Sequence, residues 1–182
     1  MVAGRAASAA EAGSDWGRIL LALAAGLVLI SGQGFFASGR GLPGYAPEWA
    51  VTLTVWLIWR AEKKAAVAAV FILGLFRDAA GGGLLGLYPV ALVATACFFQ
   101  PYSLKLRLEA ALPLMLCVFG LVLGCDFLLL IPLMAALGWP GEGFNPGPAF
   151  LGSALASALT APPLFWLLNR LTRRRPMEGD HV

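Results

Sequence analysis

The sequence predicts an all-α fold, a polytopic membrane bundle of about six transmembrane helices with the N- and C-termini in the cytoplasm. Hydrophobic residues make up 59% of the 182 residues and charged residues only 13%, whereas soluble domains carry roughly 25% charged residues. The apolar residues form long runs, separated by short segments rich in Gly, Pro, Lys or Arg. Because a helix needs about 20 residues to cross the bilayer, the chain has room for about six crossings and almost no extramembrane domain.

The order of these segments divides the chain into three regions. Residues 1–15 are predicted to be a disordered cytoplasmic tail, because their Ala, Gly and Ser residues can bury little apolar surface. Residues 16–172 are predicted to form a single transmembrane domain, and residues 173–182 a basic cytoplasmic tail. The six crossings are expected at Trp16 to about Ser38, Glu48 to Trp59, Ala65 to Arg77, Leu84 to Gln100, Leu108 to Leu137 and Ala149 to Leu171, with Pro101 ending the fourth.

The fifth apolar run is longer than one crossing needs and contains an acid, Asp126. Because it also holds Pro113 and Pro132, we expect one long, tilted or kinked helix, with a re-entrant or two-piece arrangement as the alternative. An ionisable side chain inside a crossing is costly unless it is paired or solvated. Asp126 is therefore either a carboxylate that binds a partner or ligand, or an acid held inside the bundle or near the membrane surface, and the sequence leaves both open.

The distribution of Lys and Arg predicts the orientation. With the N-terminus inside and six crossings, only Arg40 and Arg77 of the 13 basic residues fall outside, and the other eleven fall inside. This division follows the positive-inside rule. Five crossings, or the reverse orientation, would no longer place most of the basic residues on the cytoplasmic side.

One stretch, GLFRDAAGGGLLG from Gly74 to Gly86, stands out as a structural hub. The adjacent Arg77 and Asp78 are interpreted as an ion pair beside Gly81, Gly82 and Gly83, at a point where one helix stops and the next begins. Since glycine permits backbone conformations closed to other residues, we expect Asp78 to accept hydrogen bonds from the glycine-rich backbone after it and so lock the turn. The alternative is a simple pair of charges at a helix end.

Small residues in the last two runs are expected to pack inside the bundle. Gly120 and Gly124 form a GxxxG pattern, and the last run contains Gly152, Ser153, Ala154, Ala156, Ser157 and Ala158. Such residues let helices approach closely. We favour internal packing over an interface with another protein.

The residue types argue against an enzyme, a cofactor or a metal site. Cys97, Cys117 and Cys125 lie in apolar runs without CxxC spacing, and the histidine, His181, is next to the last residue. Nucleophilic triads and metal sites need histidine or clustered Cys and Asp. The glycine run lacks the GK[ST] that makes a phosphate loop specific, and the basic residues flank apolar runs, which indicates topology signals and not a nucleic-acid surface.

The pattern GLFRDAAGGGLLGLYPVAL resembles the signature of the rod-shape-determining protein MreD family, in which a Gly-x-x-x-Asp element precedes a Leu-Gly pair. Here the element is Gly74 to Asp78 and the pair ends at Gly86. The resemblance implies a non-catalytic component of the bacterial inner membrane that maintains cell shape and organises lateral peptidoglycan synthesis. The implied partners are an MreC-type bitopic membrane protein and the wider elongasome with MreB, RodA and a penicillin-binding transpeptidase.

A second class of protein fits the same architecture. Six short crossings also look like the substrate-binding S component of an energy-coupling-factor vitamin transporter, which needs several polar side chains that converge on a vitamin. The outer half offers only a few candidates, namely Arg40, Arg77, Asp78, Glu142, Asn145 and aromatic residues such as Tyr45 and Tyr88. A signal-peptidase-like membrane enzyme ranks third, since it would need paired intramembrane acids and the candidates are Asp78 and Asp126.

Overall fold

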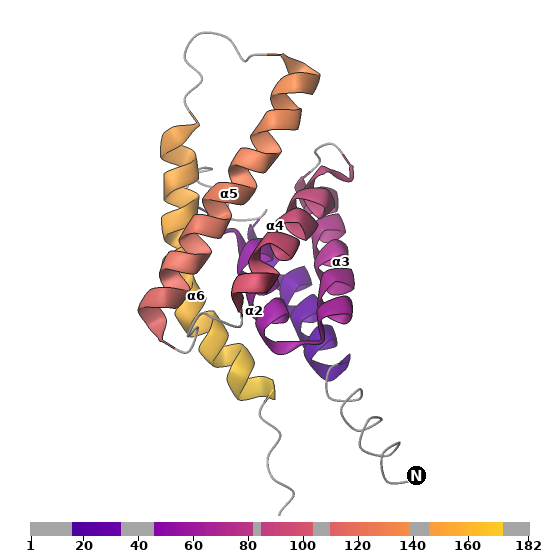
Figure 1. Ribbon diagram of the computed structural model, residues 1–182, viewed down its shortest axis with the longest axis vertical. Coiled ribbons are helices and arrows are strands. Elements are labelled where there is room, and N and C mark those ends of the chain that lie inside the picture. The colour runs from indigo at the N-terminus through magenta and orange to yellow at the C-terminus, as the bar shows by residue number, and fades with distance from the viewer. Residues whose placement is uncertain (1–15, 34–45, 82–84, 104–109, 139–145, 173–182) are drawn as a thin grey trace, which may run out of the picture.

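The computed structural model describes residues 16–33, 46–81, 85–103, 110–138 and 146–172. The regular structure in these ranges is entirely helical (Figure 1), which confirms the all-α prediction for them. The helices are an N-terminal helix Trp16–Gln33, α2 Trp49–Arg60, α3 Lys63–Gly81, α4 Leu87–Ser103, α5 Ala111–Leu137 and α6 Gly147–Thr172. The tails predicted at 1–15 and 173–182 lie outside the described residues.

Three helices in the described ranges are long and apolar enough to cross a membrane. They are Trp16–Gln33, Ala111–Pro132 within α5, and Gly147–Thr172. α2 has 12 residues, which at about 1.5 Å per residue spans well under the about 30 Å of a hydrocarbon core. α3 carries charged residues at both ends, Lys63 and Lys64 at its start and Arg77 and Asp78 near its end.

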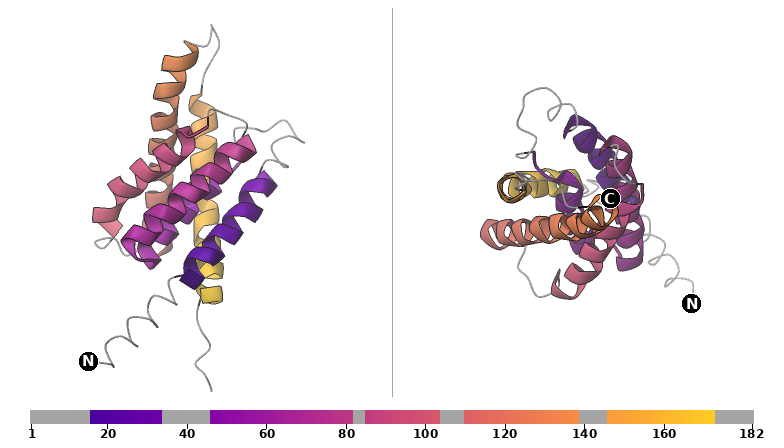
Figure 2. Two further views of the ribbon diagram at one scale, coloured as in Figure 1. Left: turned by 90° about the vertical axis from the view of Figure 1, so that its right-hand side faces the viewer. Right: turned by 90° about the horizontal axis from the view of Figure 1, so that it is seen from above.

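α2 is the central element of the bundle. All its residues from Ala50 to Ile58 are buried, and it contacts α3, α4, α5 and α6. α5 and α6 pack side by side on one flank, while α3 and α4 pack together on the other (Figures 1 and 2). The hydrophobic core is therefore built around one short helix that is buried on every side.

The helices around α2 turn large apolar side chains outward. Examples are Val28 on the N-terminal helix, Val90 on α4, Ile131 on α5 and Trp166 on α6, each at least 60% exposed. Exposed apolar surface on this scale is unusual for a soluble monomer and typical of contact with lipid or another protein. The outward faces are thus compatible with a membrane protein.

Hydrogen bonds connect three helices at the end of the bundle where α2 has its C-terminus. Arg18 Nη1 donates to the carbonyl oxygen of Arg60 at 2.9 Å, and Trp56 Nε1 donates to Asn169 Oδ1 at 3.1 Å. The first described helix begins and α6 ends at this same end of the molecule (Figures 1 and 2). Basic residues from three helices, Arg18, Arg60 and Arg170, therefore lie toward one end.

Several expected helix boundaries were wrong. α3 continues beyond Arg77 to Gly81, and α4 passes through Pro101 to Ser103. The missing N–H of Pro101 costs only one hydrogen bond in the last turn of α4, so it does not end the helix there. The long fifth run, by contrast, forms a single helix, α5, as expected, and not the two-piece alternative. Pro113 sits in its first turn, where backbone N–H groups have no intrahelical acceptor anyway, and Pro132 lies inside the helix without ending it.

The expectation for the small residues was half right. Gly152, Ala154, Ser157 and Ala158 of α6 are buried, as predicted. Gly120 and Gly124 of α5 instead face outward, and nothing lies within 4 Å of the place where a Cβ would stand on either. Gly120 lines an apolar groove between α4 and α5 together with Phe98 and Leu116. Internal packing of this GxxxG pattern was therefore the wrong prediction.

Candidate functional site

The hub joins α3 to α4 through a close backbone contact. A Cβ built on Gly74 would stand 2.7 Å from the backbone nitrogen of Pro89 and closer still to its Cα. No side chain fits such a gap, so glycine is required for α3 to pack this tightly against the first turn of α4. The glycine that begins the recognised sequence pattern is thus a helix-packing residue.

Asp78 binds the N-terminus of α4, as the sequence predicts. Its Oδ2 accepts a hydrogen bond from the Gly86 N–H at 2.6 Å, and its Oδ1 accepts one from the Tyr88 N–H at 3.2 Å. The first N–H groups of a helix lack intrahelical acceptors, and a carboxylate also interacts favourably with the positive end of the helix dipole. Asp78 therefore caps α4 from the neighbouring helix.

The glycines after Asp78 have different roles in the turn. Gly86 has a φ of 96°, a left-handed conformation that only glycine adopts without strain. Gly81 is the last residue of α3, and a Cβ on it would lie 3.2 Å from Arg77 Nη1. Gly82 and Gly83, which were also candidate site residues, lie outside the described residues.

Replacing Asp78 with alanine should destabilise the α3–α4 turn by about 0.5–2 kcal/mol, the usual effect of removing a helix cap. Asp78→Asn keeps an acceptor oxygen and should lose less. Hydrogen exchange in detergent micelles provides the measurement, since the Gly86 and Tyr88 amides should exchange faster in the alanine variant. Unchanged protection of both amides would show that the cap contributes nothing to the turn.

Arg77 pairs with a distant acid and not with Asp78, so the interpretation of Arg77 and Asp78 as an ion pair was wrong. Its Nη2 lies 3.1 Å from Glu48 Oε1, and its Nε lies 3.5 Å from Glu48 Oε2. The guanidinium also stands over the Tyr88 ring, 4.9 Å from the centroid. Consecutive helical residues point about 100° apart, which is why the two neighbouring charges reach different partners.

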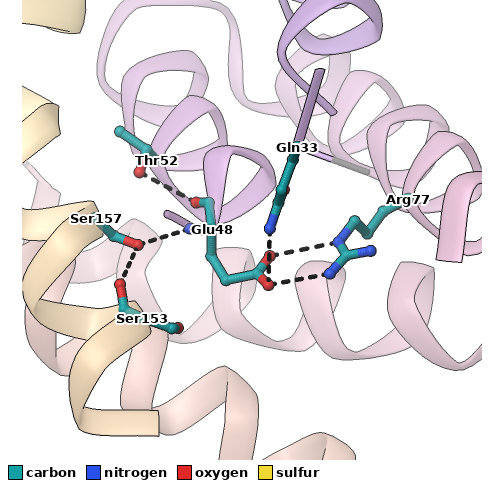
Figure 3. Close-up of polar contacts among 6 residues, drawn as sticks. All are labelled: Gln33, Glu48, Thr52, Arg77, Ser153 and Ser157. Atoms are coloured by element: carbon teal, nitrogen blue, oxygen red, sulfur yellow. Dashed lines mark hydrogen bonds and ion pairs between the residues drawn. The ribbon is translucent and has the colours of Figure 1, made fainter. Parts of the chain in front are cut away.

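Glu48 gathers polar side chains from several helices (Figure 3). Gln33 Nε2, at the end of the N-terminal helix, donates to Glu48 Oε1 at 3.4 Å. The Glu48 backbone N–H donates to Ser157 Oγ of α6 at 2.7 Å, and that hydroxyl donates to the Ser153 carbonyl at 2.7 Å. Glu48, which directly precedes α2, thus links the N-terminal helix, α2, α3 and α6.

Asp126 extends this cluster from α5. The residue is buried, with 9% of its surface exposed, and it lies close to Ser153 and within electrostatic range of Glu48 and Arg77. Of the positions left open by the sequence, it therefore occupies the one inside the bundle. We call Gln33, Glu48, Arg77, Tyr88, Asp126, Ser153 and Ser157 the buried polar cluster.

Sequence reasoning missed Gln33, Glu48 and both serines as site residues. Glu48 was placed only as the first residue of a crossing and was left out of the polar groups of the outer half. A signal existed, because Glu48 is the single charged residue between Arg40 and Arg60 and begins an apolar run on the side assigned to Arg77. Because Glu48 and Arg77 carry opposite charges and were assigned to the same side of the membrane, an ion pair between them could have been predicted.

The cluster is a network of hydrogen bonds and charges without an evident nucleophile. Within the ranges that the structure describes, no three His, Cys, Asp or Glu side chains are grouped so that they could hold a metal ion. No protein-family model matches the sequence, and neither the curated proteins nor the solved structures give a match. Function must therefore be argued from the hub and the buried polar cluster themselves.

Proposed function

We propose that this chain is a non-catalytic, multi-pass component of the bacterial inner membrane that acts as a scaffold of the elongasome, as the resemblance to the MreD family implies. The observation that carries the proposal is the structural role of the resembling residues. Gly74 packs on Pro89, and Asp78 binds the Gly86 and Tyr88 amides. The residues of the pattern therefore fix α3 and α4 relative to each other. Such a role suits a protein that holds its partners in one geometry.

The proposed topology has six crossings and both termini in the cytoplasm. It is supported by the segregation of charge along the bundle: Arg18 and Arg60 meet at one end, while Glu48 and Arg77 meet where α3 turns into α4. The first described helix begins, and α6 ends, on the basic side (Figure 1). By the positive-inside rule that side faces the cytoplasm.

Purification of the tagged chain from its own membranes tests the scaffold directly. We expect an MreC-type bitopic protein to copurify, together with MreB, RodA or a penicillin-binding transpeptidase of the wider elongasome. A matched purification of the Gly74→Ala variant should recover less of the bitopic protein per molecule of bait. Recovery of the chain without any of these proteins, under conditions that keep RodA bound to its transpeptidase, would contradict the proposal.

A second candidate, the S component of a vitamin transporter, is favoured by the buried polar cluster. The structure brings Gln33, Glu48, Asp126 and Ser153 near one another, which supplies the converging polar groups that the sequence did not indicate. This function predicts copurification with an ATPase-driven energy-coupling module and a loss of vitamin uptake on deletion. Normal uptake in a deletion strain with altered shape would exclude it.

A further inference from the structure

Cationic side chains from four helices gather at the end of the bundle where α2 has its C-terminus. They lie at the start of the N-terminal helix, the end of α2, the start of α3 and the last turn of α6, and are Arg18, Arg60, Lys63, Lys64 and Arg170. We call these five residues the basic end. The one other basic residue in the described ranges, Arg77, pairs with Glu48 at the opposite end of α2.

Direct contacts and the path of the chain bring these helix ends together. Arg18 Nη1 donates to the carbonyl oxygen of Arg60 at 2.9 Å. The ring of Trp59, next to Arg60, stacks on Phe165 of α6 with the centroids 6.1 Å apart. Lys63 follows Arg60 by three residues, and the N-terminal helix begins at the end of the molecule where α6 ends (Figures 1 and 2). The five cations therefore share one end of the bundle.

The basic end has an excess of positive charge in the described part of the chain. Its acid is Glu62, which is exposed. The other described acids lie elsewhere: Glu48 precedes α2, Asp78 binds the first turn of α4, and Asp126 lies close to Ser153. Because like charges repel one another and disfavour the compact state, an anion from outside the chain would stabilise this end.

Two of the cations stand where their own helix gains nothing from them. Arg60 and Arg170 lie in the last turns of α2 and α6, where the helix dipole favours a positive charge. Lys63 and Lys64 instead begin α3, whose first turn contains no acid, so the dipole disfavours both. Both side chains are exposed. Their position is therefore not explained by the stability of α3.

Large apolar side chains border the basic end. Trp16 and Leu20 of the N-terminal helix are each 63% exposed, and Trp166 and Leu171 of α6 are 60% and 59% exposed. The Arg170 guanidinium lies over the Trp166 ring, 5.2 Å from its centroid. Tryptophan is enriched where a membrane meets water. A ligand that fits both features is anionic at one end and apolar at the other, whereas a free anion or a nucleic acid uses only the cations.

We propose that the basic end binds anionic phospholipids, with their phosphate groups on the five cations and their acyl chains along the exposed apolar faces of the N-terminal helix and α6. Clusters of about four to eight Lys and Arg beside a transmembrane helix attract anionic lipids in this way. The inference requires only that the bundle lies in a membrane. It does not depend on the scaffold function.

Quenching of tryptophan fluorescence by lipids with brominated acyl chains tests the proposal, because Trp16 and Trp166 are exposed beside the basic end. The full chain is reconstituted in phosphatidylcholine bilayers that contain a minor fraction of brominated lipid, either phosphatidylglycerol or phosphatidylcholine. We expect stronger quenching by phosphatidylglycerol, with a difference that shrinks as sodium chloride is raised. Equal quenching by the two lipids at low salt would overturn the proposal and assign the cations to topology or to an acidic partner protein.

A competition experiment separates the lipid from a free anion. Sodium phosphate and sodium chloride are added at equal ionic strength to the bilayers with brominated phosphatidylglycerol. We expect the two salts to reduce the quenching equally, because each acts only by screening. Displacement of the lipid by phosphate at concentrations where chloride has no effect would show that the free anion is the ligand, and would overturn the assignment to a lipid.

Variants locate the site. Lys63→Gln combined with Lys64→Gln should lower the relative affinity for phosphatidylglycerol by roughly fivefold for each charge removed, the factor expected for one cation near an anionic membrane surface. Lys63→Arg combined with Lys64→Arg is the matched control, because it keeps both charges and should keep the affinity. Glu62→Gln removes the neighbouring acid and should raise the affinity. If neither the glutamine pair nor Glu62→Gln changes the selectivity, the assignment to the basic end is wrong.

Discussion

Replacing Glu48 with alanine is expected to lower the free energy of unfolding by about 3–5 kcal/mol, because it leaves Arg77 without its carboxylate in a mostly buried site. The Glu48 and Arg77 side chains are 10% and 21% exposed, so solvent compensates little. Gln33 loses its acceptor in the same step, while the backbone N–H of residue 48 keeps its bond to Ser157. Thermal or denaturant unfolding in detergent micelles, followed by tryptophan fluorescence, measures the change.

A double-mutant cycle with Arg77→Ala separates the pair from other effects. If the two residues act through each other, the double variant should lose less stability than the sum of the single variants, with a coupling energy of about 0.5–3 kcal/mol. Glu62→Ala, at an exposed position, serves as the control and should change stability by no more than about 0.5 kcal/mol. Strictly additive losses would show that the ion pair does not stabilise the bundle.

Gly74→Ala is the second change with a large expected effect. The added methyl would overlap the backbone of Pro89, and neither backbone can rotate away as a side chain can. Overpacking of this kind costs about 1–3 kcal/mol and occasionally more, and we expect a value at or above the upper end. The same unfolding assay in micelles measures it.

Gly120→Ala and Gly124→Ala are matched controls, because each adds the same methyl to a helix where nothing lies within 4 Å. Alanine favours a helix over glycine by up to about 1 kcal/mol, so these variants should be neutral or slightly more stable. Equal tolerance of alanine at Gly74 would contradict the close α3–α4 packing. Equal intolerance at Gly120 would place a contact on a face of α5 that is open in the structure.

The parts of the fold that sequence analysis predicted correctly depend on local signals. Long apolar runs gave the helices of the described ranges, and a carboxylate shortly before a glycine-rich turn gave the contacts of Asp78 with Gly86 and Tyr88. Both signals are local: Asp78, for example, contacts residues only 8 and 10 positions further along the chain. They carry no information about which helices become neighbours.

The parts that were missed depend on contacts between distant segments. Glu48 lies 29 residues from Arg77 and 109 residues from Ser157, and no spacing rule connects them. Gly74 and Gly120 are the same residue type in similar apolar runs, yet one touches a backbone and the other faces open space. Only the position of the neighbouring helix decides between these two outcomes.

The residues of the α3–α4 turn are connected by polar contacts to several helices of the bundle. Asp78 fixes α4 to α3, and the adjacent Arg77 joins α3 to Glu48 at the start of the central helix α2. Glu48 in turn binds α6 through Ser157. The contacts of Asp78, Arg77 and Glu48 thus connect the turn to α2, α3, α4 and α6, and this connection is the basis of the proposed scaffold function.

Depletion of the chain in the organism that encodes it, with microscopy of cell shape and of labelled sites of new peptidoglycan, tests the proposed scaffold function most directly. We predict rounded cells with dispersed wall synthesis, restored to rods by the unaltered chain and by Gly120→Ala but not by Gly74→Ala at equal expression. Depleted cells that stay rod-shaped, with wall synthesis still confined to the side wall, would contradict the account.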